Sequence, residues 1–266
     1  MTAPPAVTTS EEYDAFAPYY DAFTAGSDYE AWTRHVLELA RPLGLRGKSM
    51  LDLACGTGKS FVPFLQRGFE VTGCDISGEM LAQAARKAPG VRLVRADLRD
   101  LGRIGRFDLV TCFDDSLNYL LGESDLGRAM RGIAANLSPA GIALFDLNTL
   151  YSYRTTFAGD SVVDRDGTVF AWQGESTADA PPGCTAAATI DVFTPRGIEL
   201  YERIRTRHVQ RHFSPERVTA LLADARLDCL GVRGAREDGS LAAELDETRH
   251  LKAVYAARPS KGGDAR

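Results

Sequence analysis

The chain lacks the features that mark membrane and exported proteins. Its apolar runs, such as residues 142–145, are far shorter than the ~18 residues that a membrane span needs. The N-terminal segment has neither the basic part nor the apolar part of a signal peptide. We therefore expect a cytoplasmic protein that makes no membrane contact.

An excess of basic residues is also missing. The 266 residues include 31 Lys and Arg against 36 Asp and Glu, which gives a formal net charge of −5. Affinity for a phosphate backbone comes mainly from a basic surface, so this balance argues against a nucleic-acid partner. A small molecule is the better expectation, bound by a monomer or a homodimer.

Cysteine and histidine do not form a metal-binding or disulfide pattern. The five cysteines are an odd number without C-x-x-C spacing, which excludes a disulfide framework and a zinc knuckle. His208 and His212 are four residues apart, but no H-E-x-x-H motif or third ligand accompanies them. We expect reduced cysteines and no bound metal.

A glycine-bearing turn is present, but it lacks the glycines of two common nucleotide-binding motifs. A P-loop ending at Gly58-Lys59-Ser60 would need glycine at position 53, where the chain has leucine. A dinucleotide motif would need a third glycine after Gly56 and Gly58, and Phe61 stands there. Both absences argue against phosphate-bearing cofactors.

From residue 49 onward, short β-rich runs alternate with helical runs, which is typical of βαβ units and a parallel sheet. We therefore predict an α/β fold with a doubly wound, mostly parallel sheet. The expected strands are 50–54, 70–75, 91–95, 108–113 and 141–147, and the expected helices between them are 59–67, 78–87 and 124–137.

The remaining segments predict additions to this core. Two helices, the first starting near Ser10 and the second over 29–41, precede it. Three β-like stretches at 160–173, 185–194 and 199–213, with no helix between them, predict a small antiparallel cap. A helix over 214–226 and strands at 228–233 and 249–257 follow. The expected division is a helical lid (1–48), a cofactor-binding core (49–150), a cap over the active site (151–213), a C-terminal part of the core (214–258) and a frayed tail (259–266).

Acidic and glycine residues stand where successive strands end. Gly56 and Gly58 allow the backbone to approach a bound group closely, and Asp75 and Asp97 end the next two strands. In parallel sheets such strand ends meet at one edge, where ligands bind. A strand-end acid in this position can accept both hydroxyls of a ribose.

These residues resemble the successive motifs of class I S-adenosylmethionine-dependent methyltransferases. Within that superfamily, the segment 115–120 and the cap strand ending at His208-Val209-Gln210-Arg211 resemble small-molecule enzymes related to bacterial amino-sugar N-methyltransferases. Ala54 and Ala140 depart mildly from the pattern, since many members carry glycine there. The motifs are 51–58, Asp75, 96–98, 107–110 and 137–141.

The resemblance implies S-adenosylmethionine as cofactor and S-adenosylhomocysteine as its product. Asp75 would bind the ribose hydroxyls, Asp97 with Leu98 the adenine, and Asp52 with the glycine turn the methionine end. Tyr20 and Tyr29 would close over that end, although plain helix packing explains these aromatics equally well. The full expected cofactor set is Tyr20, Tyr29, Asp52, Ala54, Cys55, Gly56, Gly58, Asp75, Ile76, Met80, Asp97, Leu98 and Phe113.

The cap and the segment after the fourth core strand supply the catalytic candidates. His208, Gln210 and His212 alternate along a strand and should share the face toward the pocket. We predict His208 as proton acceptor, Tyr119 as positioning group and Asp115 as a further candidate. The run of arginines from Arg203 to Arg211 is typical of a solvated face, although it could neutralise an anionic substrate.

The predicted function is methyl transfer to a nitrogen or oxygen of a small molecule, in bacterial specialised metabolism. A nicotinamide-dependent oxidoreductase and a non-catalytic S-adenosylmethionine-binding protein remain alternatives. The sequence does not identify the acceptor.

Overall fold

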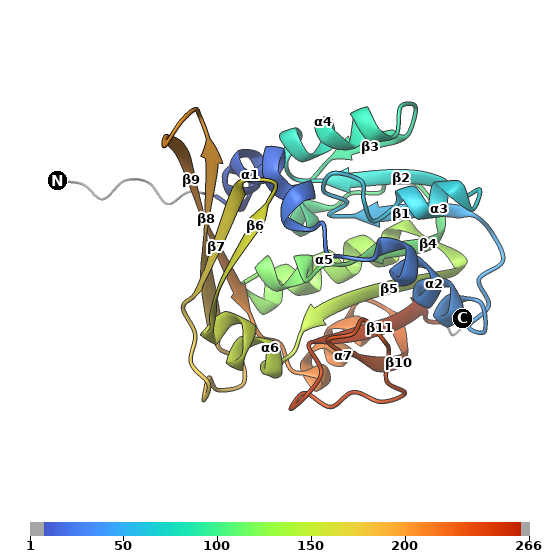
Figure 1. Ribbon diagram of the computed structural model, residues 1–266. Helices are drawn as coiled ribbons and strands as arrows, with labels where there is room; N and C mark the ends of the chain where they lie inside the picture. Colours follow the sequence, from blue (N-terminus) through green and yellow to red (C-terminus); the bar gives the residue numbers. More distant parts are fainter. Residues whose placement is uncertain (1–7, 262–266) are drawn as a thin grey trace.

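A computed structural model describes residues 8–261, and it contains two β-sheets side by side (Figure 1). The larger sheet has the strand order β10-β11-β5-β4-β1-β2-β3. Strand β11 is antiparallel to both neighbours, and the other pairs are parallel. Its strands are β1 (Ser49–Leu53), β2 (Glu70–Asp75), β3 (Arg92–Arg95), β4 (Phe107–Cys112), β5 (Leu137–Asn148), β10 (Leu227–Ala235) and β11 (Lys252–Pro259).

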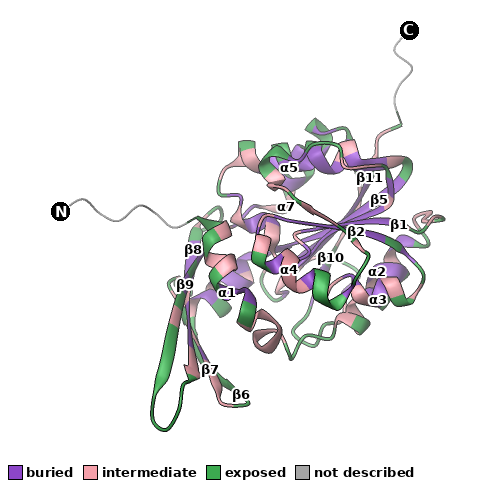
Figure 2. Cartoon of the chain, turned by 90° about the horizontal axis from the view of Figure 1, so that it is seen from above, coloured by how far each residue is buried: buried purple, intermediate pink, exposed green. Residues whose placement is uncertain are grey.

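Hydrophobic clusters cover both faces of this sheet, which is why its central strands are buried along nearly their whole length. One cluster joins the sheet to α5 (Glu123–Asn136) and α7 (Pro215–Asp224). The other joins it to α2 (Tyr29–Ala40), α3 (Val62–Gln66) and α4 (Gly78–Lys87). Figure 2 shows the buried strands at the centre of the core. The predicted doubly wound sheet is confirmed.

The second sheet is antiparallel, in the order β6-β7-β8-β9. Its strands are β6 (Asp160–Arg165), β7 (Thr168–Gly174), β8 (Thr185–Pro195) and β9 (Tyr201–Arg211). The prediction of one strand over 160–173 was wrong, because Asp166 and Gly167 adopt positive φ angles of 51° and 85° and form a tight hairpin turn. We call these four strands the cap sheet.

Two helical predictions need correction. Helix α3 begins at Val62 rather than at residue 59, because Gly58 has a φ of 85° and the turn continues through Phe61. Helix α6 (Leu150–Arg154) between the sheets was not predicted at all. Three short 3-10 segments complete the fold: η1 (Leu98–Asp100), η2 (Ser116–Tyr119) and η3 (Thr156–Ala158). None of the helices in residues 8–261 has the length and apolar content of a membrane span.

Helix α1 (Thr9–Phe23) connects the two sheets, and its N-terminus is fixed by a capping box between Thr8 and Glu11. The end of the helix is attached to the glycine turn of the core. Thr57 Oγ1 donates to Asp21 at 2.6 Å, and Lys59 Nζ donates to the Thr24 carbonyl at 2.9 Å. On its other side, Phe16 packs against cap strands β7 and β8. The helix is therefore held in place from both sheets.

Candidate active site

The turn after β1 places two glycines in different roles. Gly56 has a φ of 51°, and a Cβ there would find only a Tyr20 ring carbon, at 3.9 Å, so this part of the backbone is open to a ligand. A Cβ on Gly58 would lie 2.7 Å from the Phe61 ring. Gly58 thus permits the packing of Phe61 and lines none of the cavities described below.

Ala54 also adopts the left-handed conformation, with a φ of 52°. Only glycine enters this region without strain, so the geometry explains why glycine is common at this position in the family that the sequence resembles.

Asp75 closes the glycine turn against the end of β2. Its Oδ2 accepts a hydrogen bond from the Gly56 amide at 2.8 Å, and its Oδ1 accepts one from the Ser77 amide at 2.9 Å. Burial raises the pKa of this carboxyl, while the backbone hydrogen bonds oppose the rise. The carboxylate is held rigidly at the edge where the strands end.

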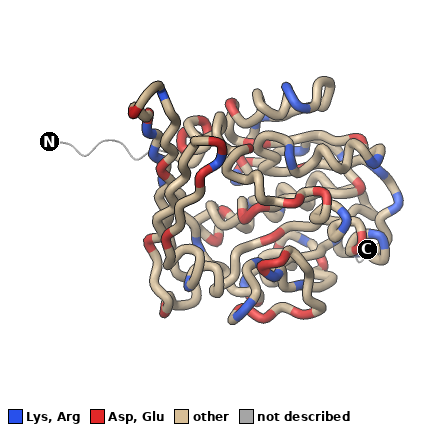
Figure 3. Tube along the Cα trace, viewed as in Figure 1, with Lys and Arg blue, Asp and Glu red and all other residues tan. Residues whose placement is uncertain are grey.

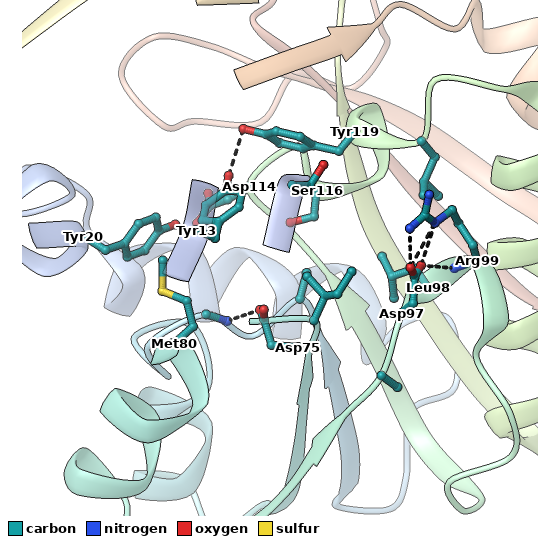
Figure 4. A pocket seen from close by; sticks show the side chains of 16 residues that line it. Tyr13, Tyr20, Asp75, Met80, Asp97, Leu98, Arg99, Asp114, Ser116 and Tyr119 are labelled. Atoms are coloured by element: carbon teal, nitrogen blue, oxygen red, sulfur yellow. Dashed lines mark hydrogen bonds and ion pairs between the residues drawn. The ribbon is translucent and has the colours of Figure 1, made fainter. Parts of the chain in front are cut away.

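A cleft of about 840 Å³ opens at this edge (Figure 4). At one end, Asp97 accepts hydrogen bonds from the backbone amide and the side chain of Arg99, and this pairing lowers the pKa of Asp97. Tyr13 and Tyr119 stand over the other end. The cleft is lined by Thr9, Tyr13, Tyr20, Ala54, Gly56, Asp75, Ile76, Met80, Ala96, Asp97, Leu98, Arg99, Asp114, Ser116, Tyr119 and Leu120.

A smaller recess of about 300 Å³ lies beside the cleft, around the glycine turn. Asp52 lies in it and accepts hydrogen bonds from Ser60 at 2.5 Å and Thr111 at 2.6 Å. Burial raises the pKa of Asp52 to about 6. The recess is lined by Tyr20, Tyr29, Asp52, Ala54, Cys55, Gly56, Thr57, Lys59, Ser60, Phe113 and Asp114.

A third cavity, of about 890 Å³, lies between the cap sheet and the core, and we call it the cap cavity. It shares Tyr13, Tyr20, Asp114 and Tyr119 with the cleft, so the two spaces meet at these side chains. The other lining residues are Phe16, Phe23, Thr24, Asp115, Asn148, Ser152, Thr156, Phe157, Trp172, Ile190, His208, Gln210, Leu251 and Lys252.

Asp114 and Asp115 follow β4 with consecutive left-handed φ angles of 58° and 52°. Both backbone amides donate to Asp146, at 3.2 and 2.7 Å, which fixes this unusual turn. The two side chains then differ. The Asp114 side chain is 48% exposed and lines all three spaces, and its Oδ2 accepts a hydrogen bond from Tyr29 at 3.0 Å.

Asp115, the predicted catalytic candidate, is held by two donors. Lys252 Nζ donates to Oδ1 at 2.8 Å and Gln210 Nε2 donates to Oδ2 at 2.5 Å. Burial opposes ionisation of Asp115, but Lys252 holds its pKa below the usual value. Asp115 is therefore a partner of Lys252, and Asp114 is the carboxylate left open to a ligand. Asp114 also had a signal in the sequence, since it follows a buried strand. Nothing in the sequence favoured Asp114 over its neighbour Asp115.

Tyr119 and His208 meet at the boundary between the cleft and the cap cavity. The Tyr13 hydroxyl donates to Tyr119 at 2.8 Å, and the Tyr119 oxygen forms a hydrogen bond of 3.0 Å with His208 Nδ1. His208 Nε2 forms a second hydrogen bond, with the Thr206 hydroxyl, also at 3.0 Å. Burial lowers the pKa of His208 to about 4, so the imidazole is neutral near pH 7.

His212 was expected on the pocket-facing side with His208 and Gln210, and this was wrong. It follows the end of β9 and lies 2.9 Å from Glu247, outside the lining of the cap cavity. The arginines of β9 form a solvated face: Arg203 and Arg205 bind Asp191, and Arg207 binds Glu175. Figure 3 shows basic and acidic positions close together along the cap strands.

Comparisons with known proteins agree with this geometry. A family described as "Methyltransferase domain" matches residues 50–141. "Putative methyltransferase YqeM" of Bacillus subtilis strain 168 is 33% identical over 215 residues, which cover 79% of this chain and 84% of the relative. The dTDP-3-amino-3,4,6-trideoxy-alpha-D-glucopyranose N,N-dimethyltransferase of Streptomyces venezuelae is 33% identical over 162 residues, 58% of this chain and 67% of the relative.

Among solved structures, an S-adenosylmethionine-dependent methyltransferase from Clostridium acetobutylicum ATCC 824 has a TM-score of 0.77 and 27% identity. The alignment covers 93% of this chain and 99% of that one. The chain therefore belongs to the class I S-adenosylmethionine-dependent methyltransferases, and its cofactor is S-adenosylmethionine. A nicotinamide-dependent oxidoreductase is not supported, because Phe61 stands at the position where a dinucleotide-binding motif needs its third glycine.

The polar groups of the cleft match those of this cofactor. S-adenosylmethionine carries a ribose diol, an adenine and an amino-acid tail, but no phosphate. Asp75 offers a buried carboxylate, and the open side of Gly56 leaves room for a close approach. Among residues 8–261, the cation that lines the cleft is Arg99, and Asp97 already neutralises it. The cleft thus offers little that could bind a phosphate, but it offers groups that can bind a diol and an adenine.

Proposed function

We propose that the chain transfers a methyl group from S-adenosylmethionine to the nitrogen of a small-molecule amine held in the cap cavity. The observation that carries this proposal is the junction of the cleft and the cap cavity at Tyr13, Tyr20, Asp114 and Tyr119. An acidic side chain at that junction suits an amine. Similar proteins include enzymes named as amino-sugar N,N-dimethyltransferases, which supports nitrogen as the acceptor atom.

The proposed cofactor contacts follow the sequence-based assignment. Asp75 would accept the ribose hydroxyls, Asp97 and Leu98 would contact the adenine, and Asp52 with the turn at Gly56 would hold the methionine end. The lining of the cleft and the recess supports these positions. Tyr29 lines that recess too, and its hydroxyl connects α2 to Asp114.

When bound, the cofactor supplies an electrophilic methyl group, so the chain must mainly align the acceptor and exclude water. Holding reacting atoms at near-attack distance can lower a barrier by ~7–11 kcal/mol. With cofactor and acceptor bound, the aromatic residues around the junction would restrict the access of water. Alignment is therefore the main catalytic contribution that we assign to this site.

Tyr119 is the proposed positioning group. Its oxygen accepts one hydrogen bond from Tyr13, and with Nδ1 of His208 unprotonated, the tautomer that we propose, it donates its own proton to that nitrogen. One lone pair of that oxygen remains for an N–H group of the acceptor. The carboxylate of Asp114 can accept a second N–H. An amine that donates both N–H groups in this way would point its nitrogen lone pair away from Tyr119 and Asp114.

His208 was predicted as the proton acceptor, and its surroundings favour a different role. An imidazole with a pKa near 4 is a weak base for an amine proton. We propose that neutral His208 holds Tyr119 in place through Nδ1. The proton that leaves the nitrogen would then pass to water.

The wider setting is also proposed. Five cysteines without a disulfide partner in the structure and an acidic composition support a cytoplasmic enzyme, as a monomer or a homodimer, that does not act on nucleic acid. Relatives named for amino sugars support a place in bacterial specialised metabolism.

The test is direct detection of methyl transfer. The protein is incubated with S-adenosylmethionine and a panel of primary and secondary amines, and mass spectrometry records S-adenosylhomocysteine together with the methylated amine. Asp75→Ala serves as the control with weakened cofactor binding. Methyl transfer to alcohols but to none of the amines would overturn the assignment to nitrogen.

A further inference from the structure

The walls of the cap cavity carry an excess of negative charge near the proposed acceptor position. Three carboxylates, Asp114, Asp115 and Asp146, surround Lys252 Nζ at 3.6, 2.8 and 3.4 Å. One ammonium group facing three carboxylates leaves about two negative charges in excess at this end of the cavity. Lys252 is therefore already neutralised and has little attraction left for an anion.

No other cation replaces Lys252 in the lining that the structure describes. His208 is the remaining basic group there, and its burial keeps it neutral near pH 7. The arginines of β9 do not reach the cavity, since Asp191 and Glu175 bind Arg203, Arg205 and Arg207 on the other side of the cap sheet. A phosphate or diphosphate is usually bound by arginine, lysine or oriented backbone amides.

Another part of the cavity wall is aromatic. Trp172 contacts Phe157 edge-on, with ring centroids 5.2 Å apart, and its indole N–H donates to the Thr156 carbonyl at 2.9 Å. Phe16 and Phe23 line the side next to α1. Such a wall binds flat apolar groups and favours cations over anions.

We infer that the acceptor is an unphosphorylated amine with an aromatic or otherwise flat apolar body, and not a nucleotide-linked sugar. The amine lies toward Asp114, and the body lies against Trp172 and Phe157. This inference rests on the proposed function and narrows it, because several relatives are named for dTDP-linked substrates. The carboxylates would repel the diphosphate of such a substrate.

The test compares matched ligands that differ by one phosphate. Calorimetry in the presence of S-adenosylhomocysteine measures the affinity of tyramine, of tyramine O-phosphate and of thymidine diphosphate. We expect tyramine to bind at least about tenfold more tightly than its phosphate ester, which carries nearly two extra negative charges. Thymidine diphosphate should show no binding. Tighter binding of the ester or of thymidine diphosphate, or no binding of tyramine, would overturn the inference.

Two variants test whether the preference for tyramine over its phosphate ester arises from Asp114. Asp114→Asn should weaken tyramine binding about tenfold and reduce the difference between tyramine and its ester. Glu244→Gln removes a charge from the exposed surface and should change neither affinity. An equal effect of both variants would contradict the role of Asp114.

A third measurement separates this inference from the proposed function. Methyl transfer to a dTDP-linked amino sugar, without transfer to unphosphorylated amines, would leave the methyltransferase assignment intact and remove the inference. Failure to bind S-adenosylhomocysteine would instead remove the proposed use of the cleft.

Discussion

The cofactor cleft and the cap cavity hold their polar groups by different means. In the cleft, Asp75 is fixed by two backbone amides of neighbouring turns, Gly56 and Ser77. In the cap cavity, Asp115, Gln210 and Tyr119 are fixed by other side chains from distant segments. A backbone-held site changes little when side chains are substituted, whereas a site held by side chains can be altered one residue at a time. This difference fits the proposed use of the cleft for one constant cofactor and of the cavity for a variable acceptor.

The largest expected effect comes from removing the carboxylate of the cleft. Asp75→Ala should lower the affinity for S-adenosylhomocysteine by more than about tenfold, because two charge-assisted hydrogen bonds to the ribose would contribute ~1.5–3 kcal/mol each. Calorimetry measures the affinity, and circular dichroism checks that the fold persists. Unchanged affinity would mean that the ribose binds elsewhere.

A pH-dependent difference in stability should follow from His208. Its folded pKa of about 4 lies below the ordinary value of 6.5, so the unfolded chain binds more protons between these values. Stability therefore falls as the pH falls through this window, by about 3 kcal/mol from this group.

The measurement is urea unfolding of the wild type and His208→Asn at pH 7 and pH 4.5. The wild type should lose more stability on acidification than the variant. Asp52 and Asp146, whose pKa values are raised to about 6, favour the folded state at low pH, but they are present in both proteins and cancel in the comparison. A parallel loss in both proteins would show that His208 is not buried as a neutral group.

Removing one hydroxyl should test the boundary between the two regions. Tyr119→Phe should lower kcat about tenfold or more while changing the affinity for S-adenosylhomocysteine by less than about threefold, because the hydroxyl would orient the acceptor rather than the cofactor. Tyr13→Phe, which removes the donor to Tyr119, should act in the same direction with a smaller effect. If Tyr119→Phe weakened cofactor binding as much as turnover, the division between cleft and cavity would fail.

The smallest expected effect concerns the outer face of the cap sheet. Asp191 is buried and binds Arg203 and Arg205, whose side chains are about half exposed and therefore well screened by solvent. Asp191→Asn should lower the free energy of unfolding by about 1 kcal/mol. The affinity for S-adenosylhomocysteine should stay the same, since this face does not line either space. A loss of cofactor affinity would mean that the cap sheet positions the cleft.

The sequence predicted the cleft better than the cavity, for a physical reason. In a parallel sheet, successive strands end at one edge, so local patterns around Gly56, Asp75 and Asp97 already imply that these residues meet. The cap cavity is assembled by long-range pairing that no local pattern specifies. Periodicity placed His208 and Gln210 on one face correctly, but it could not show that His212 lies beyond the end of the strand. Nor could it show that Asp115 is neutralised by Lys252.

The antiparallel direction of β11 has a consequence for synthesis. A parallel strand would bring its last residue to the ligand-binding edge, but β11 brings its first residue there, with Lys252 opposite Asn148. Lys252 follows Asp146 by 106 residues in the chain. The three carboxylates around Lys252 are thus synthesised long before the lysine that balances their charge. A chain that ends before residue 252 would hold an unbalanced cluster of acids, so the charge of this cluster is balanced only once β11 has been made.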